Sequence, residues 1–328
     1  MELHVDYQAI TESIRKDLDS VERLIVENLG SQVPLIPRVG EHVFGAGGKR
    51  FRPALLLLCA RLAGYQGLRA HNLAAVIEFV HTASLLHDDV VDNARLRRGR
   101  EAANLVYGNQ ASVLVGDFLY GRASSMLADD GDIRTVKVVA EALRAMAEGE
   151  VMQLGRQHDM DTSEVEYIAV VADKTGVLIS AASELGAILG EREGEEREAL
   201  RAFGFTLGIA FQLMDDALDY VADEKLFGKA TGNDLAEGKV TLPLIWTLKA
   251  CTLSERETIN AVFKSGPPGL EDFRAVVALI HRYGGIERTV AQAREYVTQG
   301  RRRLDIFPDG AEKDALRELS NYVVARER

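Results

Sequence analysis

The chain has 328 residues, and its 50 acidic and 39 basic side chains give a formal net charge of −11. Hydrophobic residues make up 47% of the sequence, enough to build a core, so intrinsic disorder is excluded. The acidic balance argues against general nucleic-acid binding, which needs a basic face.

Cysteine usage and hydropathy indicate the compartment. Two cysteines, Cys59 and Cys251, are too few for a disulfide scaffold, and neither lies at zinc-binding spacing from a second Cys or a His. No uncharged apolar stretch approaches the ~18 residues that a membrane-spanning helix needs. Residues 1–6 carry acids and show no apolar region of the signal-peptide type. We therefore expect a cytoplasmic protein.

The distribution of proline predicts a helical fold. Residues 54–242 contain no proline, and proline both breaks helices and marks turns. No run of alternating β-branched residues is bounded by Asn-Gly or Asp-Gly, so strand signals are missing. Apolar periodicity and breaker residues predict helices at 4–29, 33–44, 51–64, 69–94, 101–128, 132–155, 163–190, 194–222, 235–251, 254–265, 270–283, 286–304 and 311–327.

Further features of this pattern predict how the helices are organised. Helices are expected to end at Gly64, Gly131, Gly190 and Gly228. Residues 169–189 are apolar nearly all round, which predicts a central helix covered by others. No Gly-, Ser- or Pro-rich linker divides the chain and no internal repeat is visible, so we expect a single all-α domain over residues 1–328.

Two clusters of aspartates follow apolar stretches with the same spacing. They consist of Asp88, Asp89 and Asp92, and of Asp215, Asp216 and Asp219. On a helix, residues i and i+4 lie on one face, so Asp88 and Asp92 point the same way. Most Asp runs are solvated acidic faces, but such faces usually carry interspersed lysines, and Asp is a poor residue for a helix interior. Oxygen ligands at this spacing suit Mg²⁺, which shares its shell with substrate phosphates, so the pattern predicts a magnesium-dependent diphosphate site.

Positive charge is concentrated in two short segments. Residues 47–53 read Gly-Gly-Lys-Arg-Phe-Arg-Pro, and a second basic segment follows the first Asp cluster with Arg95, Arg97, Arg98 and Arg100. The first segment is not a Walker loop, because Lys49 is followed by Arg50 rather than Ser or Thr. Either segment alone is also compatible with a solvated basic loop.

Taken together, these motifs resemble those of the trans-isoprenyl diphosphate synthases, the polyprenyl synthetase family. The resemblance rests on the turn at 47–53, on Asp-Asp-Val-Val-Asp followed by Leu-Arg-Arg-Gly, and on Phe-Gln-Leu-Met-Asp-Asp-Ala-Leu-Asp-Tyr at 211–220. Gly228-Lys229 and Glu-Gly-Lys-Val-Thr-Leu-Pro-Leu at 237–244 also match, in the family order. Residues 81–89 and 112–118 resemble the long-chain branch, especially octaprenyl diphosphate synthases.

The resemblance implies a fold and a set of roles. It implies a helical bundle around a deep central cavity, usually a homodimer, with two to three Mg²⁺ ions per active site. Asp88 and Asp92 would bind two ions on the allylic diphosphate and Asp215 a third, supported by Asp89, Asp216 and Asp219. Isopentenyl diphosphate would be held by Lys49, Arg52, His81 and Arg98. The allylic diphosphate would be held by Arg97, Lys174, Lys229 and Lys239, while Thr175 and Gln212 would lie near the reacting carbons.

Helix geometry agrees with several of these roles. His81 lies seven residues before Asp88, and Gln212 lies three before Asp215, so each pair shares a helix face. Lys174 lies in an apolar helix, where an ammonium group needs an anionic partner.

The implied activity is the repeated condensation of isopentenyl diphosphate onto an allylic diphosphate such as farnesyl diphosphate, giving quinone side chains. A shorter-chain synthase is the main alternative. A terpene cyclase would lack the Lys49–Arg52 turn and the second Asp cluster, and a non-catalytic subunit would have lost carboxylates or basic residues. We expect no nucleic-acid partner and at most peripheral membrane contact for product release.

Product length is expected to depend on the residues just before the first Asp cluster. Members of the family that stop early carry bulky aromatics four or five residues before the first Asp, where this chain has Ser84 and Ala83. Small residues there also allow close helix packing. Ser84 lies nearer the Asp88 face, and residues 124–127 carry no large aromatic, so we expect a long product of about eight isoprene units.

Overall fold

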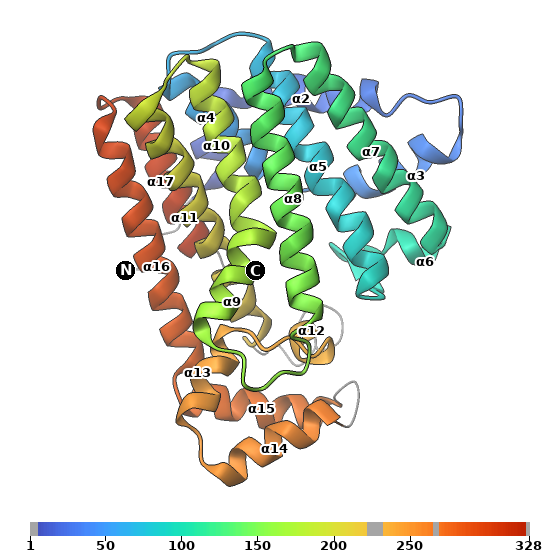
Figure 1. Cartoon of the computed structure of the whole chain (residues 1–328), viewed down its shortest axis with the longest axis vertical. Helices are drawn as coiled ribbons and strands as arrows, with labels where there is room; N and C mark the ends of the chain where they lie inside the picture. Colours follow the sequence, from blue (N-terminus) through green and yellow to red (C-terminus); the bar gives the residue numbers. More distant parts are fainter. Residues whose placement is uncertain (1–5, 222–231, 265–268, 326–328) are drawn as a thin grey trace.

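The computed structural model describes residues 6–221, 232–264 and 269–325, and in these ranges the chain is almost entirely helical (Figure 1). The helices are α1 (Tyr7–Thr11), α2 (Arg15–Asn28), α3 (Leu35–Phe44), α4 (Phe51–Leu62), α5 (Arg69–Val91), α6 (Ala103–Tyr107), α7 (Asn109–Asp130), α8 (Ile133–Leu154), α9 (Glu164–Val171), α10 (Val177–Leu189), α11 (Gly194–Asp219), α12 (Asn233–Ala236), α13 (Leu242–Ala250), α14 (Leu253–Lys264), α15 (Leu270–Arg282), α16 (Gly285–Arg303) and α17 (Ala311–Ala325). Short 3-10 turns η1 (Glu12–Ile14) and η3 (Leu304–Ile306) and a π-helical turn η2 (Ala172–Gly176) complete the helical part. The all-α fold class predicted from the sequence is confirmed.

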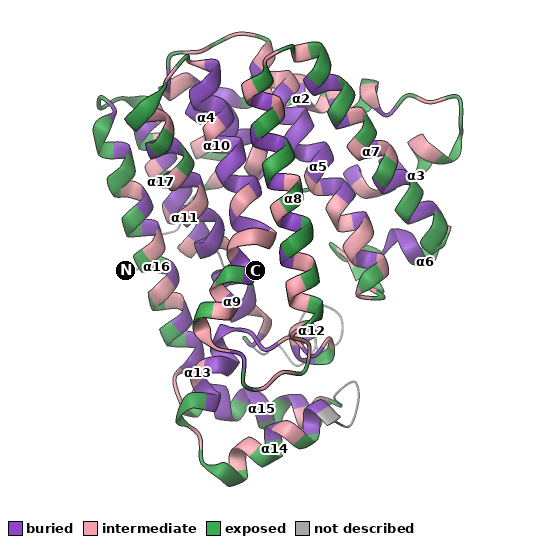
Figure 2. Ribbon diagram, viewed as in Figure 1, coloured by how far each residue is buried: buried purple, intermediate pink, exposed green. Residues whose placement is uncertain are grey.

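The long helices form a bundle whose centre is α10. This helix packs against α4, α5, α8 and α11, and nearly all of its residues are buried (Figure 2). Small residues permit the close approach: a Cβ at Gly186 would lie 2.6 Å from Cβ of Cys59 on α4. The interior is therefore packed too closely for a larger side chain at that position. The central apolar helix expected within 163–190 is confirmed.

A two-stranded hairpin interrupts the helices, although no strand signal was found in the sequence. Strands β1 (Leu96–Arg97) and β2 (Arg100–Glu101) pair antiparallel, with Leu96 opposite Glu101. The two residues between them, Arg98 and Gly99, have φ values of 53° and 77°, the left-handed conformation that tight hairpins require. The strands are too short to give an alternating pattern, so the sequence carried no signal for them.

Several predicted helices are divided in the structure. The expected helix 101–128 is broken by Gly108, whose φ of 87° does not fit a helix, into α6 and α7. The expected helix 4–29 is interrupted by η1, and 235–251 is split by the segment 237–241 between α12 and α13. Gly64, Gly131 and Gly190 follow helices as expected, whereas Gly228 lies outside the described residues. In the described part of the chain, no helix is both long and apolar enough to cross a membrane.

Candidate functional site

The helices enclose a cavity of about 1190 Å³. Its walls come from α4, α5, α8, η2 and α11, together with the hairpin and the segment after α12. Most residues singled out in the sequence meet there, although they come from distant segments. These are Lys49, Arg52, His81, Ser84, Asp88, Asp92, Arg97, Arg98, Lys174, Thr175, Gln212, Asp215, Asp216 and Lys239. Lys229 lies outside the described residues, and Ala83, Asp89 and Asp219 are not part of the lining.

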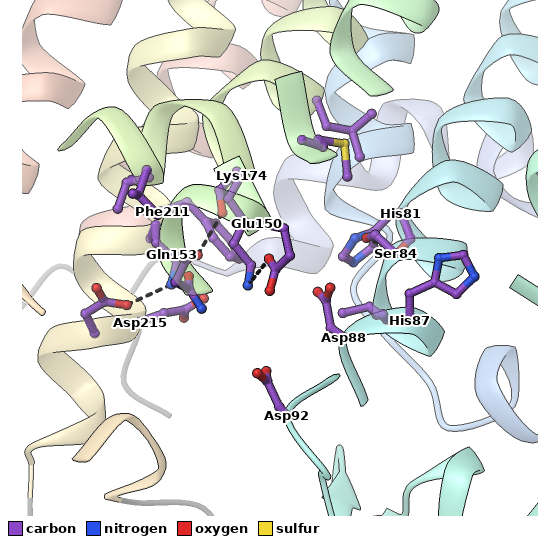
Figure 3. Close-up of a pocket in the computed structure, with 18 of the residues that line it drawn as sticks. His81, Ser84, His87, Asp88, Asp92, Glu150, Gln153, Lys174, Phe211 and Asp215 are labelled. Atoms are coloured by element: carbon purple, nitrogen blue, oxygen red, sulfur yellow. Dashed lines mark hydrogen bonds and ion pairs between the residues drawn. The ribbon is translucent and has the colours of Figure 1, made fainter. Parts of the chain in front are cut away.

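Three aspartates approach the cavity from opposite walls. Asp88, in the last turn of α5, and Asp215, near the end of α11, both point into it (Figure 3). Asp92 caps the end of α5, and its Oδ2 accepts a hydrogen bond from Nζ of Lys239 at 3.1 Å. Its other oxygen, Oδ1, is buried and has no hydrogen-bond partner. A buried carboxylate oxygen without a partner is costly, so this side of the cavity favours a bound cation.

The pKa of Asp88 also favours a bound cation. Burial raises the pKa of its carboxyl to about 6; Lys174 opposes this shift, whereas Glu150 and Asp92 add to it. The raised pKa thus comes mainly from burial of the carboxyl, a cost that a bound cation would offset.

The donor set fits a divalent metal shared with substrate. Within residues 6–221, 232–264 and 269–325, no three Asp, Glu, His or Cys side chains lie close enough together to hold a metal ion by themselves. Asp88 and Asp92 on one wall and Asp215 on the other can instead supply one or two oxygens each. Mg²⁺ suits such a partial site, because it keeps several waters and is completed by substrate phosphates.

The remaining aspartates hold other residues of the site. Asp216 is buried and accepts hydrogen bonds from Oη of Tyr167 at 2.5 Å and from Nε2 of Gln212 at 2.7 Å. Burial raises the pKa of Asp216 to about 6, an effect that these two hydrogen bonds oppose. Oδ2 of Asp219 accepts the backbone N–H of Asp234 at 3.0 Å. These contacts hold Tyr167, Gln212 and Asp234 in place, and the expected supporting role of Asp216 and Asp219 at the metal stays a prediction.

Asp89 and Arg97 form an ion pair that the sequence did not suggest. Asp89 is only 3% exposed, and its Oδ1 accepts hydrogen bonds from the guanidinium group of Arg97. Burial raises the pKa of Asp89, and Arg97 opposes this rise. Arg97 therefore anchors the hairpin to the end of α5. Arg97 also lines the cavity and its Nη1 takes no part in this pair, so its expected contact with the allylic diphosphate stays a prediction.

The basic side chains of the turn before α4 all line the cavity but differ in their partners. Arg50, whose backbone has a φ of 48°, pairs with Glu22 and Glu78. Lys49 and Arg52 line the cavity beside it. Nε of Arg52 is buried without a hydrogen-bond partner, and burial lowers the pKa of this side chain to about 10. Such an unpaired buried donor suits an incoming anion.

His81 and Arg98 line the cavity near Arg52. The guanidinium group of Arg98 donates to the carbonyl of Gly47, which places it beside the basic turn. Burial, followed by the charges of Arg52 and Arg98, holds the pKa of His81 well below its ordinary value. His81 is thus a neutral ring among arginines, and it can donate one hydrogen bond to a diphosphate without adding charge.

Two lysines lie near Asp88 and Asp92, and each already forms an ion pair with a glutamate. Nζ of Lys174, on the π-helical turn, lies 2.5 Å from Oε2 of Glu150 on α8. Nζ of Lys239 lies 2.5 Å from Oε2 of Glu237 as well as bonding to Asp92. Burial lowers the pKa of Lys239, but Glu237 and Asp92 outweigh this effect and the pKa is raised. Lys174 therefore has the anionic partner that its apolar helix required, and that partner is protein.

The π-helical turn also places the polar groups beside Lys174. In η2 the backbone N–H of Val177 donates to the carbonyl of Ala172, five residues earlier, so the turn is wider than an α-helical one. Oγ1 of Thr175 donates to Oε1 of Gln212 on α11 at 2.9 Å. Thr175, Gln212 and Asp216 thus form a chain of hydrogen bonds that fixes the amide near Asp215.

Beyond the charged groups the cavity becomes apolar. Its lining there includes Leu143, Met146, Leu178 and Phe211, with Ser84 one turn above Asp88. Ala83, the second expected chain-length residue, is fully buried in the helix packing and does not face the cavity. Consecutive residues of a helix point about 100° apart, so Ser84 faces the cavity while Ala83, expected to act alike, does not.

Sequence reasoning missed several residues of the lining. They are Glu150, Gln153, Tyr120 and Tyr322. The spacing of Glu150 and Gln153 on a predicted helix gave one usable signal, because residues i and i+3 share a face. Tyr120 packs against the ring of His87 with centroids 5.5 Å apart. Nothing in the local pattern marked Tyr120 or Tyr322.

Comparison with known proteins extends these observations over nearly the whole chain. Residues 33–280 match the family model "Polyprenyl synthetase". The chain is 40% identical to the octaprenyl diphosphate synthase of Escherichia coli (strain K12) over 324 residues, which cover 99% of this chain and 100% of that protein.

Solved structures agree. A polyprenyl synthase from Caulobacter crescentus CB15, complexed with calcium and isoprenyl diphosphate, matches with a TM-score of 0.94 and 40% identity over 98% of each chain. A decaprenyl diphosphate synthase from Rhodobacter capsulatus matches with a TM-score of 0.93 and 40% identity over 98% of this chain and 100% of that one. Residues of both Asp clusters line one cavity, and the likeness covers nearly the whole chain. The chain therefore belongs to the polyprenyl synthetase family.

Proposed function

We propose that this protein is a long-chain all-trans polyprenyl diphosphate synthase. It adds isopentenyl diphosphate repeatedly to an allylic diphosphate, such as farnesyl diphosphate, to a product of about eight isoprene units, as in its octaprenyl relative. The observation that carries this proposal is that one cavity is lined by cations, by carboxylates and by apolar side chains. We call the part around Lys49, Arg52 and Arg98 the basic end and the part around Asp88, Asp92 and Asp215 the acidic end. The part lined by Leu143, Met146 and Leu178 is called the apolar extension.

The acidic end is proposed to bind the allylic diphosphate with two to three Mg²⁺ ions. Asp88, Asp92 and Asp215 would hold the metal, which when bound supplies Lewis-acid stabilisation for the departing diphosphate. Lys174 and Lys239 line this end and contribute positive charge where negative charge develops. Lys229, outside the described residues, is proposed to join them. The paired glutamates keep both lysines in place before substrate arrives.

The basic end is proposed to hold isopentenyl diphosphate. Lys49, Arg52 and Arg98 neutralise its diphosphate, and His81 adds a neutral hydrogen-bond donor. These groups bring the double bond toward the allylic carbon and overcome the repulsion between two anionic substrates. Thr175 and Gln212 lie between the two ends and are proposed to line the reacting carbons.

The apolar extension is proposed to receive the growing hydrocarbon. Its walls, with Leu143, Met146 and Leu178, are apolar and can bury the hydrocarbon without fixing it at one position. Ser84, at the entrance, leaves space where a bulky aromatic would close it.

The protein is further proposed to be a cytoplasmic homodimer. Support for a dimer comes from exposed apolar side chains on α6 and α7, where Leu105 is 52% and Leu114 is 66% exposed. Exposed apolar groups on neighbouring helices are suited to burial against a second copy. Support for the compartment comes from the two free thiols, Cys59 and Cys251. Sedimentation analysis gives the oligomeric state directly.

The decisive experiment incubates the purified chain with farnesyl diphosphate, radiolabelled isopentenyl diphosphate and Mg²⁺. Thin-layer analysis of the dephosphorylated products then gives the chain length. A labelled product far longer than C20 supports the proposal, and a product that stops at C15 or C20 contradicts the long-chain assignment. If no label enters any prenyl product, or if farnesyl diphosphate alone is cyclised, the synthase assignment itself is wrong.

A further inference from the structure

The last helix of the described chain contributes a side chain to the basic end of the cavity. Tyr322 lies on α17, is only 7% exposed and lines the cavity beside Lys49. Nζ of Lys49 donates a hydrogen bond to the hydroxyl of Tyr322. The same ammonium group lies 4.9 Å from the centroid of the Tyr322 ring, beyond the hydroxyl at the ring edge rather than over the ring face. The hydroxyl of Tyr322 is thus the group that contacts Lys49.

This partner differs from the carboxylates that hold three other basic groups around the cavity. Arg50 pairs with Glu22 and Glu78, Lys174 with Glu150, and Lys239 with Glu237. In the described ranges, Lys49 forms no ion pair with a carboxylate, and a neutral phenol holds it instead. A carboxylate partner both fixes and neutralises an ammonium group, whereas a phenol fixes it and leaves its charge for an anion.

Helix packing holds the Tyr322 ring in place. The ring of Tyr7, on α1, lies 5.1 Å from it between centroids, at an angle of 51°. α17 packs against both α1 and α4, and α4 directly follows the turn that carries Lys49. Lysine has a long flexible stem, and ordering it costs conformational entropy when substrate binds. Because the rigid ring holds its hydroxyl in place, the ammonium group of Lys49 is already restricted in the folded protein. Less conformational entropy is then lost when substrate binds.

We propose that Tyr322 is a positioning residue for isopentenyl diphosphate and that it acts through Lys49. This inference rests on the proposed function and deepens it, because it adds the last helix to one of the two substrate pockets. An ammonium group has three N–H donors, so a hydrogen bond to Tyr322 leaves two for phosphate oxygens. Tyr322 therefore fixes the direction in which Lys49 offers those two donors.

The test measures binding of isopentenyl diphosphate alone, by calorimetry, so that no reaction is needed. Tyr322→Phe keeps the ring and removes the hydroxyl, and we expect about fivefold weaker binding. Tyr322→Leu also removes the ring that packs against Tyr7, and we expect binding at least as weak as in Tyr322→Phe. Affinity for farnesyl diphosphate should stay within about twofold in both variants, because that substrate binds at the other end.

The coupling to Lys49 is tested by repeating Tyr322→Phe in a Lys49→Ala background. If Tyr322 acts through Lys49, the second substitution adds less than about twofold there. Tyr7→Phe is the matched control. It removes the hydroxyl of the neighbouring ring, which is buried and has no hydrogen-bond partner. This control should bind isopentenyl diphosphate as the wild type does.

Other outcomes would overturn the inference. It is wrong if folded Tyr322→Phe binds isopentenyl diphosphate like the wild type, if its loss persists undiminished in the Lys49→Ala background, or if both substrates are weakened equally. A wild-type chain that binds isopentenyl diphosphate but makes no product contradicts the proposed function, and the coupling can still be measured. A wild-type chain that does not bind it at all contradicts both.

Discussion

Lys174 and Glu150 face each other across the acidic end of the cavity, with Nζ and Oε2 2.5 Å apart. Glu150 also adds negative charge beside Asp88. In the proposed site, Glu150 would compete with the allylic diphosphate for the ammonium group of Lys174, and the ion pair would have to loosen when that substrate binds.

Glu150→Gln should therefore strengthen binding of the allylic substrate. Gln is nearly the same size but carries no charge, so we expect the KM for farnesyl diphosphate to fall about threefold and inhibition by inorganic diphosphate to increase. Steady-state kinetics with both substrates varied provide the measurement. Glu148→Gln, an exposed position on the same helix paired with Arg144, is the matched control and should change neither value. A higher KM in Glu150→Gln would mean that Glu150 helps to bind substrate rather than competing with it.

The metal proposal predicts a large loss of turnover when a ligand is removed. Asp88→Ala and Asp215→Ala should each lower kcat about a thousandfold or more, because stabilisation of the leaving group depends on the bound metal. Excess EDTA should abolish turnover of the wild type, and added Mg²⁺ should restore it. Full activity in either variant, or in EDTA, would exclude the proposed metal site.

Asp89 and Arg97 should behave differently from these ligands, because they form an ion pair with each other. Asp89→Asn and Arg97→Ala should give similar, smaller losses of activity, and the double variant should be little worse than either single variant. A double-mutant cycle on kcat/KM measures this coupling. Independent, additive losses would show that each residue contacts substrate or metal separately.

The two diphosphate pockets should be separable by kinetics. Arg52→Ala and Arg98→Ala should chiefly raise the KM for isopentenyl diphosphate, because each removes a cation from the basic end. Lys239→Ala should act on the allylic substrate and on kcat, since Lys239 also holds Asp92. Equal effects of all three variants on both substrates would contradict the assignment of two pockets.

Product length should respond to Ser84 but not in the same way to Ala83. Ser84 lines the cavity and bonds only to the His81 carbonyl of its own helix among the described residues, so Ser84→Phe should fold and place a ring in the extension. We expect shorter products with continued consumption of isopentenyl diphosphate. Chromatography of the products measures this, with Ser84→Ala as the control. If Ser84→Phe still makes the full-length product, the extension does not run past this residue.

Ala83→Tyr should instead destabilise the protein. Ala83 is fully buried between helices, and a ring there overpacks the interior at a cost of about 1–3 kcal/mol or more. Thermal unfolding provides the measurement. A soluble, stable Ala83→Tyr variant with shortened products would show that this position reaches the cavity.

The depressed pKa of His81 predicts a pH-dependent stability. His81 titrates well below its ordinary value of 6.5 in the folded chain, whereas in the unfolded chain it takes up a proton near that value. The unfolded state therefore binds more protons below pH 6.5, and the free energy of unfolding falls as the pH decreases. Relative to His81→Asn, the wild type should lose roughly 1.4 kcal/mol per pH unit below about pH 6.

Urea denaturation of both proteins between pH 7.5 and 5 measures this difference. The raised pKa values of Asp88 and Asp216, about 6 in each case, change stability in the opposite direction. Both carboxyls are present in the wild type and in His81→Asn, so their contribution cancels in the comparison. A difference that is constant with pH would mean that His81 takes up its proton in the folded state as well.

The sequence predicted most of the helices and the gathering of charged motifs, because both leave local signals. Apolar periodicity and breakers marked the long helices, and the i, i+4 spacing of Asp88 and Asp92 marked their shared face. It did not predict the contacts that fix the charged groups. Glu150 and Lys174, or Lys49 and Tyr322, meet only after helices distant in the chain have packed. The hairpin at 96–101 and the break at Gly108 depend on one or two backbone angles, which residue patterns specify weakly.

Because of the π-helical turn at Ala172–Gly176, the geometry of the cavity depends on how many residues this segment has, as well as on which residues they are. Its wider turn holds one more residue than the α-helical path between Tyr167, which bonds to Asp216, and the buried Leu178. Removing a single residue here would let α9 and α10 join as one regular helix. Either Lys174 and Thr175 would then rotate away from Glu150 and Gln212, or the buried faces of α9 and α10 would fall out of phase. A one-residue gap in this segment of any related chain therefore marks a rebuilt active site, even where every motif is intact.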